Sequence, residues 1–423
     1  MSRELVIIAG VRTPFARMGT EIASLSASDL GRHAVAALLD RTALDPAELA
    51  EVIFGCVGQP ADSANIARVI ALRAGVPEHV PAATVNRNCA SGLEALTCAH
   101  QRLLAGMGDL FIVGGVESMS NYPLMYRHGA VEHFTELAKA KTLKDRLLAL
   151  SHFRPEDFSP LLALQLGLSD PVSGLNMGET AEILVRDYAI SREAQDHFAA
   201  RSHEKALAAQ ADTQAEITAV HVEGVAVTQD NGMRSDSTVE KLSKLRPVFD
   251  HKTGSVTAGN ASQITDGAVA LLVGSEASAE ALGIQPLGRL VDYAYTGCDP
   301  SHMGLGPVKA IAAVNARTEL TLDEADLVEI NEAFAAQVLS VLKALKDPEL
   351  AQKAGLDAPL GAIPESKLNA RGGSIALGHP VGATGARLVL SALNQLAANQ
   401  GHRALVSLCI GGGQGAALWL ERT

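Results

Sequence analysis

The sequence has few aromatic residues, few cysteines and no long apolar run. Aromatic residues make up 4% of the 423 residues, which argues against a stacking platform for bases. The five cysteines are odd in number and form no CxxC pair, so neither a disulfide framework nor a zinc site is expected. No apolar run reaches the ~18 residues that a membrane-spanning helix needs. We therefore expect a protein of a reducing compartment, with a cytoplasmic location.

Charge and composition exclude further classes of protein. The net charge is -12, and no basic patch with interleaved aromatics occurs, so nucleic acid is not an expected partner. The chain is 47% hydrophobic and 19% charged, which allows a large core, and its length suggests two or three domains. The apolar run at residues 5–9, ended by Gly10, predicts a buried strand instead of a signal peptide.

Strand and helix patterns alternate along the chain, and the last third repeats the order of the first. This alternation predicts a mostly parallel sheet covered by helices, built as a duplicated α/β unit. Ser28 is the expected N-cap of the first helix. The predicted strands are 5–9, 51–56, 82–85, 110–113, 326–330 and 404–408, and the predicted helices are 28–39, 65–74, 93–105, 332–344 and 386–397.

The stretch between the halves, residues 121–264, has a different character. It is richer in charge, histidine and helix formers, and prolines at 155, 160 and 171 interrupt its pattern. We interpret it as a large excursion from the first half. Its apolar segment 158–168 is predicted to be a helix packed within the excursion, with a lid or a membrane-surface contact as alternatives.

A first candidate site is the motif at residues 88–92 (NCASG), between a predicted strand and a predicted helix. Unpaired N–H groups and the dipole at a helix N-terminus favour a thiolate, which makes Cys89 a candidate nucleophile. Its small neighbours would let a substrate approach. The alternative is a buried structural cysteine.

Two polar motifs supply candidate partners for this thiol. In residues 378–380 (GHP), the histidine has a restricted backbone and an accessible ring, so His379 could accept a proton from a thiol; the alternative is a loop histidine without a role. Asn331 and Glu332 directly follow a predicted strand, where active sites of α/β proteins are built. Asn331 would also serve as the N-cap of helix 332–344.

A second cysteine stands in residues 409–415 (CIGGGQG), at the end of a predicted strand. Cys409 could donate or accept a proton, and the glycine backbone could present N–H groups to an oxyanion. The alternatives are a tight turn or a phosphate-binding loop. The glycine spacing does not match G-x-G-x-x-G with a following helix, which argues against a dinucleotide site.

Together these motifs have the order and spacing of the thiolase family, which the chain resembles along nearly its whole length. The resemblance extends to residues 11–15 (VRTPF), 114–119 (GGVESM) and 257–262 (TAGNAS). It implies a thiolase fold, in which two duplicated βαβ-type halves form a layered αβαβα arrangement with a large inserted loop domain. The implied domains are an N-terminal half at 1–121, to which 265–286 return, an inserted loop domain at 122–264, and a C-terminal half at 287–423.

The resemblance also implies an acyltransferase that cleaves 3-ketoacyl-CoA with CoA into acetyl-CoA and a shortened acyl-CoA, reversibly. It assigns the nucleophile to Cys89, the base to His379 and the proton transfer at the α-carbon to Cys409. Acyl-CoA and CoA are the implied substrates, with no bound cofactor and no metal. The resemblance implies two oxyanion sites: Asn331, through a water, forms one with His379, and the N–H groups of Gly411 and Cys89 form the other. It places Ser262 and Ala258 at the pantetheine. It places Met177, Met303 and Phe334 around the acyl group.

One departure favours a degradative role over the alternative, biosynthesis of acetoacetyl-CoA. Asn176 precedes Met177, where many acetoacetyl-CoA-forming thiolases have histidine. The segments 143–168 and 236–250 are similar to the thiolase subunit of trifunctional β-oxidation complexes. This similarity makes a hydratase/dehydrogenase α subunit a further predicted partner. The thiolase resemblance as a whole implies a homodimer or homotetramer, and a peripheral membrane contact stays the alternative for segment 158–168. Arg371 has no counterpart role in the resemblance.

Two other functions remain to be weighed. A condensing ketoacyl synthase would share the fold, but such enzymes usually lack a second reactive cysteine, so Cys409 argues against it. A non-catalytic thiolase-like protein that binds acyl-CoA or lipid would be expected to lack one of the reactive groups, and all are present.

Overall fold

The computed structural model describes residues 4–423, which form a ten-stranded sheet divided into two halves. The strand order is β12-β13-β14-β11-β1-β10-β5-β3-β4, with β2 paired to β10. The halves join where β1 meets β11 through only two residue pairs, Val6 with Arg289 and Ile7 with Gly288. The strands of this sheet are β1 Val6–Arg12, β2 Ala16–Arg17, β3 Glu51–Gly55, β4 Ala82–Val85, β5 Leu110–Ser118, β10 Thr265–Gly274, β11 Gly288–Gly297, β12 Leu327–Ile330, β13 Arg403–Ile410 and β14 Gln414–Glu421.

The two halves repeat one strand order, which confirms the predicted duplication. β1-β10-β5-β3 in one half corresponds to β11-β14-β13-β12 in the other. The prediction of a mostly parallel sheet is wrong, because only the pairs β3–β4, β3–β5 and β12–β13 are parallel among the described strands of this sheet. Strands buried on both faces have continuous apolar sequences whatever their direction, so the pattern could not reveal the antiparallel pairs.

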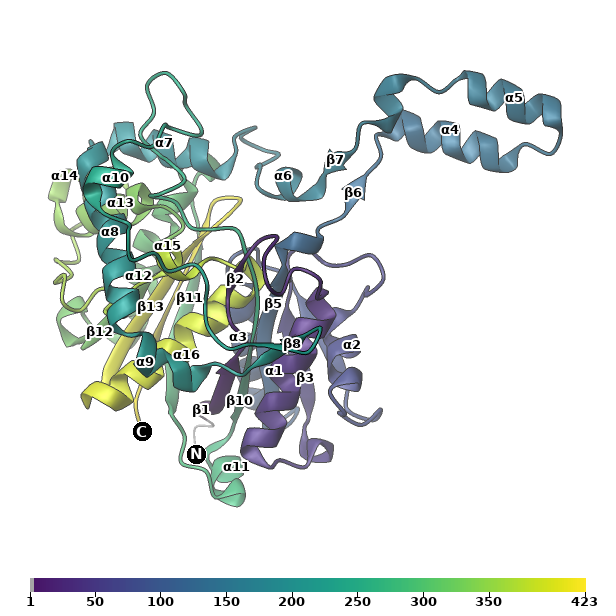
Figure 1. Cartoon of the computed structure of the whole chain (residues 1–423). Helices are drawn as coiled ribbons and strands as arrows, with labels where there is room; N and C mark the ends of the chain where they lie inside the picture. The colour runs from purple at the N-terminus through teal and green to yellow at the C-terminus, as the bar shows by residue number, and fades with distance from the viewer. Residues whose placement is uncertain (1–3) are drawn as a thin grey trace.

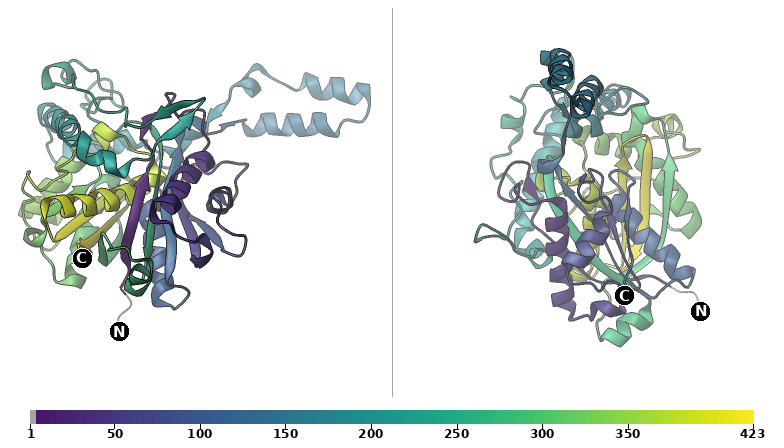
Figure 2. Two further views of the ribbon diagram at one scale, coloured as in Figure 1. Left: turned by 60° about the horizontal axis from the view of Figure 1, so that its bottom comes forward. Right: turned by 90° about the vertical axis from the view of Figure 1, so that its right-hand side faces the viewer.

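Helices cover both outer faces of the sheet and fill the space between its halves (Figures 1 and 2). α3 and α16 lie in the middle, where their apolar residues share one core with strands of both halves. α1 and α2 cover the N-terminal half, and α12 and α13 cover the C-terminal half, which confirms the predicted layers. The helices are α1 Ala27–Thr42, α2 Ile66–Arg73, α3 Ser91–Leu104, α7 Met177–Asp187, α8 Arg192–Ala208, α9 Gln210–Thr213, α10 Val239–Leu242, α11 Glu276–Leu282, α12 Gly306–Thr318, α13 Ala335–Lys346, α14 Pro348–Lys353, α15 Ser374–Leu377 and α16 Val381–Asn399.

Two predicted helix starts need correction. α1 is capped by Ser26, not Ser28, because Ser26 and Asp29 form a reciprocal capping box. α13 begins at Ala335, with Phe334 as its N-cap and no side-chain cap. Phe334 is extended and bridges to Ala261, and Asn331 lies before it outside the helix, so Asn331 caps no helix.

The excursion begins as an arm that projects from the body (Figure 1). β6 (Leu124–Met125) pairs with β7 (Leu161–Leu162), and between them α4 (His128–Lys139) and α5 (Leu143–Ser151) form a hairpin. The predicted helix at 158–168 is wrong: this segment holds β7 and the five-residue α6 (Ala163–Gly167), and Phe158 is 60% exposed. Pro160 interrupts the segment. No helix in the described chain, the arm included, is long and apolar enough to cross a membrane.

Candidate active site

Two loops from opposite halves meet at the sulfur of Cys89. One loop joins β4 to α3, and Asn88 in it adopts a positive φ of 45°. The other is the turn from β13 to β14, where Gly412 and Gly413 have φ of 87° and 79°. Asn88 Nδ2 donates a 2.8 Å hydrogen bond to the Gly411 carbonyl, and the Gly411 N–H in turn donates to the Cys89 thiol. The predicted pairing of Cys89 with the Gly411 backbone is therefore present in the geometry.

Burial decides the protonation of this thiol. Desolvation raises the pKa of Cys89, and the N–H groups of Gly411 and of Cys89 itself only partly oppose it. The raised pKa runs against the expectation that the helix N-terminus favours a thiolate, because the desolvation cost is larger than the effect of these two N–H groups. The thiol therefore needs a base.

His379 has the protonation state of such a base. Burial, reinforced by the charge of Arg387, lowers the pKa of His379 to about 3, so the imidazole is neutral. Its Nδ1 lies 2.7 Å from Thr384 Oγ1, and that hydroxyl donates to the Pro380 carbonyl. The single Thr384 proton is thereby used, so Nδ1 carries the ring proton and Nε2 is left with a lone pair.

The lone pair of His379 Nε2 faces Asn331. Asn331 Nδ2 lies 3.4 Å from Nε2, and the amide orientation is fixed because Asn331 Oδ1 accepts a 2.6 Å bond from Ser374 Oγ. Among residues 4–423, no hydrogen bond joins His379 to either thiol. The predicted pair of Asn331 and His379 is thus assembled.

A buried ion pair contacts Ser374, where the hydrogen bonds that lead through Asn331 to His379 begin. Arg387 on α16 donates to Ser374 Oγ at 3.2 Å and lies 3.5 Å from Glu329 on β12. Arginine can only donate, so Ser374 must accept from it and give its own proton to Asn331. Burial raises the pKa of Glu329 to about 7, although Arg387 pulls it down. Donor direction therefore runs without a break from Arg387 to His379.

Cys409 lies at the end of β13, beside the Cys89 thiol. Burial, with the nearby Cys89 and Cys298 thiols, raises the pKa of Cys409 well above its ordinary value. All five cysteines are free thiols. Cys409 shares an apolar cluster with Met303 and Phe334, against which Met177 packs. The three residues predicted around the acyl group are therefore brought together with the second thiol.

Ser262 and Ala258, the two residues predicted at the pantetheine, differ in how exposed they are. Ser262 is held beside this cluster, because its N–H donates to the Ala333 carbonyl at 2.9 Å and Ala261 bridges to Phe334. Ala258 is exposed on the loop that precedes it. Asn176 is engaged as the N-cap of α7, where its side chain accepts from the Glu179 N–H. This cap places Met177 at the first turn of α7, against Gly411, where a Cβ atom would lie 3.3 Å from the Met177 sulfur.

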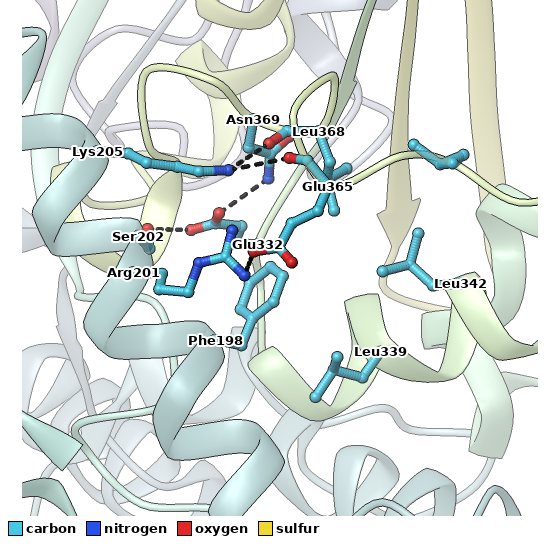
Figure 3. Close-up of a pocket in the computed structure, with 11 residues that line it drawn as sticks. Phe198, Arg201, Ser202, Lys205, Glu332, Leu339, Leu342, Glu365, Leu368 and Asn369 are labelled. Carbon is cyan, nitrogen blue, oxygen red and sulfur yellow. Dashed lines mark hydrogen bonds and ion pairs between the residues drawn. The ribbon is translucent and has the colours of Figure 1, made fainter.

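Glu332 lines a separate pocket of about 180 Å³ (Figure 3), whose lining includes none of the candidate reacting groups. Its carboxylate accepts from Ser202 Oγ at 2.6 Å, Asn369 Nδ2 at 2.8 Å and the Ile375 N–H at 3.2 Å. Glu332 therefore anchors the start of α15, which carries Ser374. The carboxylate that does border the site is Glu117, at the end of β5.

Sequence reasoning assigned no role to Ser374, Arg387 and Glu329. The signal available was a charged residue inside each of two apolar elements, Glu329 within β12 and Arg387 within α16, because a buried charge requires a partner. The sequence does not say which partner it has. Arg371, which the resemblance left unexplained, lies 3.8 Å from Asp212.

Comparison with known proteins agrees with this site. The family model for the thiolase N-terminal domain matches residues 5–277, and that for the C-terminal domain matches residues 284–422. A 3-ketoacyl-CoA thiolase of Pectobacterium atrosepticum is 39% identical, over 99% of this chain and 97% of the relative. A probable acetyl-CoA acyltransferase of Staphylococcus epidermidis is 41% identical, over 99% of this chain and 98% of the relative.

Solved structures agree as well. The acetyl-CoA acetyltransferase of Bacillus anthracis superposes with a TM-score of 0.87 at 36% identity, covering 100% of this chain and 99% of the other. Human mitochondrial 3-ketoacyl-CoA thiolase in complex with CoA superposes with a TM-score of 0.86 at 35% identity, covering 100% and 98%. Both family domains match in order along the whole fold, and the chain therefore belongs to the thiolase family of acyltransferases.

Proposed function

We propose that this thiolase works in the degradative direction, cleaving 3-ketoacyl-CoA with free CoA through an acyl group on Cys89. The observation that carries the proposal is the meeting of Cys89 with the Gly411 N–H, beside Cys409, in a site that also holds a neutral His379. Each of these groups has a task in breaking a carbon–carbon bond next to a thioester. The ligands are substrates, acyl-CoA and CoA, and no step requires a bound cofactor.

In the first half-reaction, His379 Nε2 takes the proton of Cys89, and the thiolate attacks the 3-keto carbon. The bond between C2 and C3 breaks, and its electron pair stays on C2 as the enolate of acetyl-CoA. Cys409 gives its proton to C2, and acetyl-CoA leaves. The high pKa of Cys409 suits this step, because a thiol that holds its proton serves as the acid for a carbanion.

In the second half-reaction, the thiol of free CoA loses its proton to the Cys409 thiolate and attacks the thioester on Cys89. The shortened acyl-CoA leaves, and Cys89 recovers the proton held by His379. The N–H groups of Gly411 and Cys89 stabilise the oxyanion of each tetrahedral intermediate, and Asn331 with His379 stabilises the enolate oxygen. Loss of one such donor typically costs about 3–4 kcal/mol of barrier.

The test is to incubate the protein with CoA and either 3-ketobutyryl-CoA or 3-ketooctanoyl-CoA, and to follow the acyl-CoA products by chromatography. We expect both to be cleaved, and mass spectrometry of rapidly quenched protein to find the shortened acyl group on the Cys89 peptide. Binding of acyl-CoA without cleavage at any chain length would favour a non-catalytic, lipid-binding protein. Condensation of acetyl-CoA with a higher kcat than thiolysis would favour the biosynthetic alternative.

Assembly, location and domain boundaries complete the proposal. We expect a homodimer or homotetramer in the cytoplasm, serving fatty-acid β-oxidation, with the inserted loop domain at 122–264. The arm is the region suited to a hydratase/dehydrogenase α subunit or a membrane surface, because α5 carries exposed leucines at 143, 147 and 150, with lysines at 139, 141 and 144 nearby. Analytical ultracentrifugation with and without such a subunit, and flotation with anionic vesicles, would test each contact.

A further inference from the structure

The pocket lined by Glu332, shown in Figure 3, lies between α8, α13 and the segment 363–369. Its volume of about 180 Å³ is below the roughly 300–1,000 Å³ of pockets that hold drug-sized ligands. A ligand of this pocket must therefore be a small molecule, and CoA is too large for it. The proposed mechanism gives the pocket no task.

Four charged residues line the pocket, and two of them pair with each other. Arg201 forms an ion pair with Glu365, and both side chains are well exposed, at 41% and 61%. The other two are Lys205 and Glu332. Among residues 4–423, no ion pair joins either of them to a charged partner or to each other. The pocket therefore holds one cation and one anion that each lack a direct counterion.

The ammonium group of Lys205 has only neutral oxygens as hydrogen-bond partners. It donates to the carbonyls of Leu368 at 2.7 Å and of Glu365 at 3.4 Å, so one of its three N–H groups has no acceptor among the described residues. Burial, reinforced by the charge of Arg201, lowers the pKa of Lys205. A carboxylate in the pocket would supply both the missing acceptor and the opposite charge.

The carboxylate of Glu332 has room for one more donor. Its Oε2 accepts from Ser202 Oγ and the Ile375 N–H, whereas its Oε1 accepts only from Asn369 Nδ2. A carboxylate accepts at about four positions, so one position on Oε1 remains. Burial raises the pKa of Glu332, and these bonds only partly oppose it. An ammonium group in the pocket would fill that position and favour the charged form.

Most of the remaining lining is apolar and not fully buried. Phe198 on α8, Leu339 and Leu342 on α13, and Ile363 each keep part of their surface exposed. Figure 3 shows Leu339 and Leu342 on the side away from Lys205. An aliphatic group placed against them leaves water, which raises affinity about three- to fourfold per methylene.

We propose that this pocket binds an α-amino acid with an aliphatic side chain, such as leucine. The carboxylate of the amino acid contacts Lys205 and its ammonium group contacts Glu332, while its side chain covers Leu339 and Leu342. A fatty acid would pair with Lys205 but bring a second carboxylate toward Glu332. A simple amine would leave Lys205 without a counterion. An aliphatic amino acid matches both charges and the apolar wall.

Isothermal titration calorimetry with three related compounds tests this match. They are L-leucine, 4-methylpentanoate, which lacks the amino group, and 3-methylbutylamine, which lacks the carboxylate. We expect leucine to bind the wild-type protein, and each of the other two to bind at least tenfold more weakly, because each leaves one charged group of the pocket without a partner.

Two variants locate the bound amino acid. Lys205→Met keeps an aliphatic side chain but removes the charge, and it should lower the affinity for leucine at least tenfold. Ile363→Trp, at a partly exposed position, fills the pocket without changing a charge and should abolish binding even if Lys205→Met does not fold. Lys343→Met is the matched control, because the Lys343 ammonium also donates to two backbone carbonyls but does not line this pocket. It should bind leucine as the wild type does.

Three outcomes would overturn the amino-acid site. They are no binding of leucine to the wild type, equal affinity for leucine and 4-methylpentanoate, and wild-type affinity for leucine in both Lys205→Met and Ile363→Trp. Because the titration involves no thiolysis, failure of this site would leave the proposed function standing. Failure of thiolysis would likewise leave the amino-acid site standing.

Discussion

The loop before the central helix carries a thiol in the N-terminal half and an imidazole in the C-terminal half: Cys89 precedes α3, and His379 precedes α16. The corresponding strand ends differ as well. β5 ends near Glu117, and β13 ends near Cys409. One duplicated frame therefore places the proposed nucleophile and the proposed base at equivalent positions, before α3 and before α16.

Glu117 and Cys409, at these two strand ends, have different surroundings. Glu117 accepts bonds from the N–H groups of Val57, Gly58 and Gly382 and from the Tyr122 hydroxyl. Cys409 has an apolar surrounding and no such set of donors among the described residues. Duplication thus lets one copy of a position bind the halves together, while the other copy is free for the proton transfer proposed for Cys409.

The largest expected effect comes from removing the nucleophile of the N-terminal half. Cys89→Ala should lower the thiolysis rate by about 10⁴-fold or more, as for other enzymes that lose a nucleophile. Intact mass spectrometry after mixing with substrate should find no acyl adduct. Cys98→Ala, at a half-buried cysteine on the adjoining α3, is the control. An adduct on the Cys89 variant, or on a different cysteine in wild type, would contradict the assignment.

Removing the thiol of the C-terminal half should separate the two half-reactions. In Cys409→Ser, Cys89 still accepts an acyl group, but exchange of the acetyl-CoA α-protons with deuterated water falls about 10²- to 10³-fold, because a hydroxyl is a poorer proton carrier. NMR of acetyl-CoA measures the exchange. Cys298→Ser, at a neighbouring thiol, should exchange at the wild-type rate. Equal exchange in all three proteins would remove Cys409 from the mechanism.

The structural carboxylate can be tested by a change of one atom. Glu117→Gln replaces an acceptor oxygen by an NH₂ group that faces N–H donors, and we expect the free energy of unfolding to fall by about 3 kcal/mol. Urea unfolding at neutral pH measures this loss. Glu132→Gln, at an exposed carboxylate on α4, should change stability by less than about 0.5 kcal/mol. Similar values for both variants would mean that Glu117 does not hold the halves together.

Sequence reasoning proposed candidate reactive groups but none of the residues that orient Asn331. Cys89, His379, Cys409 and Asn331 stand in short motifs whose local spacing is visible along the chain. The contacts that orient Asn331 are not local, since Glu329, Ser374 and Arg387 come from three separate elements. Strand direction was missed for a related reason, because a strand such as β10 is an apolar run whichever neighbour it joins.

His379, the proposed base in the C-terminal half, should make the free energy of unfolding depend on pH. The pKa of His379 is about 3 in the folded protein, against an ordinary value of 6.5 for a histidine exposed to water, so the unfolded chain binds its proton first. The stability that depends on a neutral His379 is fully present above pH 6.5, the pKa in the unfolded chain, and is lost as the pH falls toward 3. Between about pH 7 and pH 5 this residue alone costs about 2 kcal/mol of stability.

Urea unfolding of wild type and His379→Asn over this range isolates that contribution, because other groups, such as Glu329 with its raised pKa, are common to both proteins. Between about pH 7 and pH 5, the free energy of unfolding of the wild type should fall by about 2 kcal/mol more than that of His379→Asn. His128→Asn, at a histidine whose side chain is 89% exposed, should run parallel to wild type. Parallel curves for wild type and His379→Asn would contradict a buried neutral imidazole.

The smallest expected effect concerns the hydrogen bond that gives the C-terminal half its direction. Ser374→Ala removes the hydroxyl between Arg387 and Asn331, so the Asn331 amide loses its fixed orientation. The worth of one such bond predicts an approximately fivefold lower kcat. Because the proposed mechanism assigns Asn331 to the enolate oxygen and not to the nucleophile, α-proton exchange should fall with kcat, while acylation of Cys89 proceeds as before. Ser374→Thr keeps a hydroxyl and should restore both rates. Ser391→Ala, at a buried serine on α16 that bonds Glu216, separates this effect from a general loss of packing: if it lowers exchange as much as Ser374→Ala does, the orientation of Asn331 does not depend on Ser374.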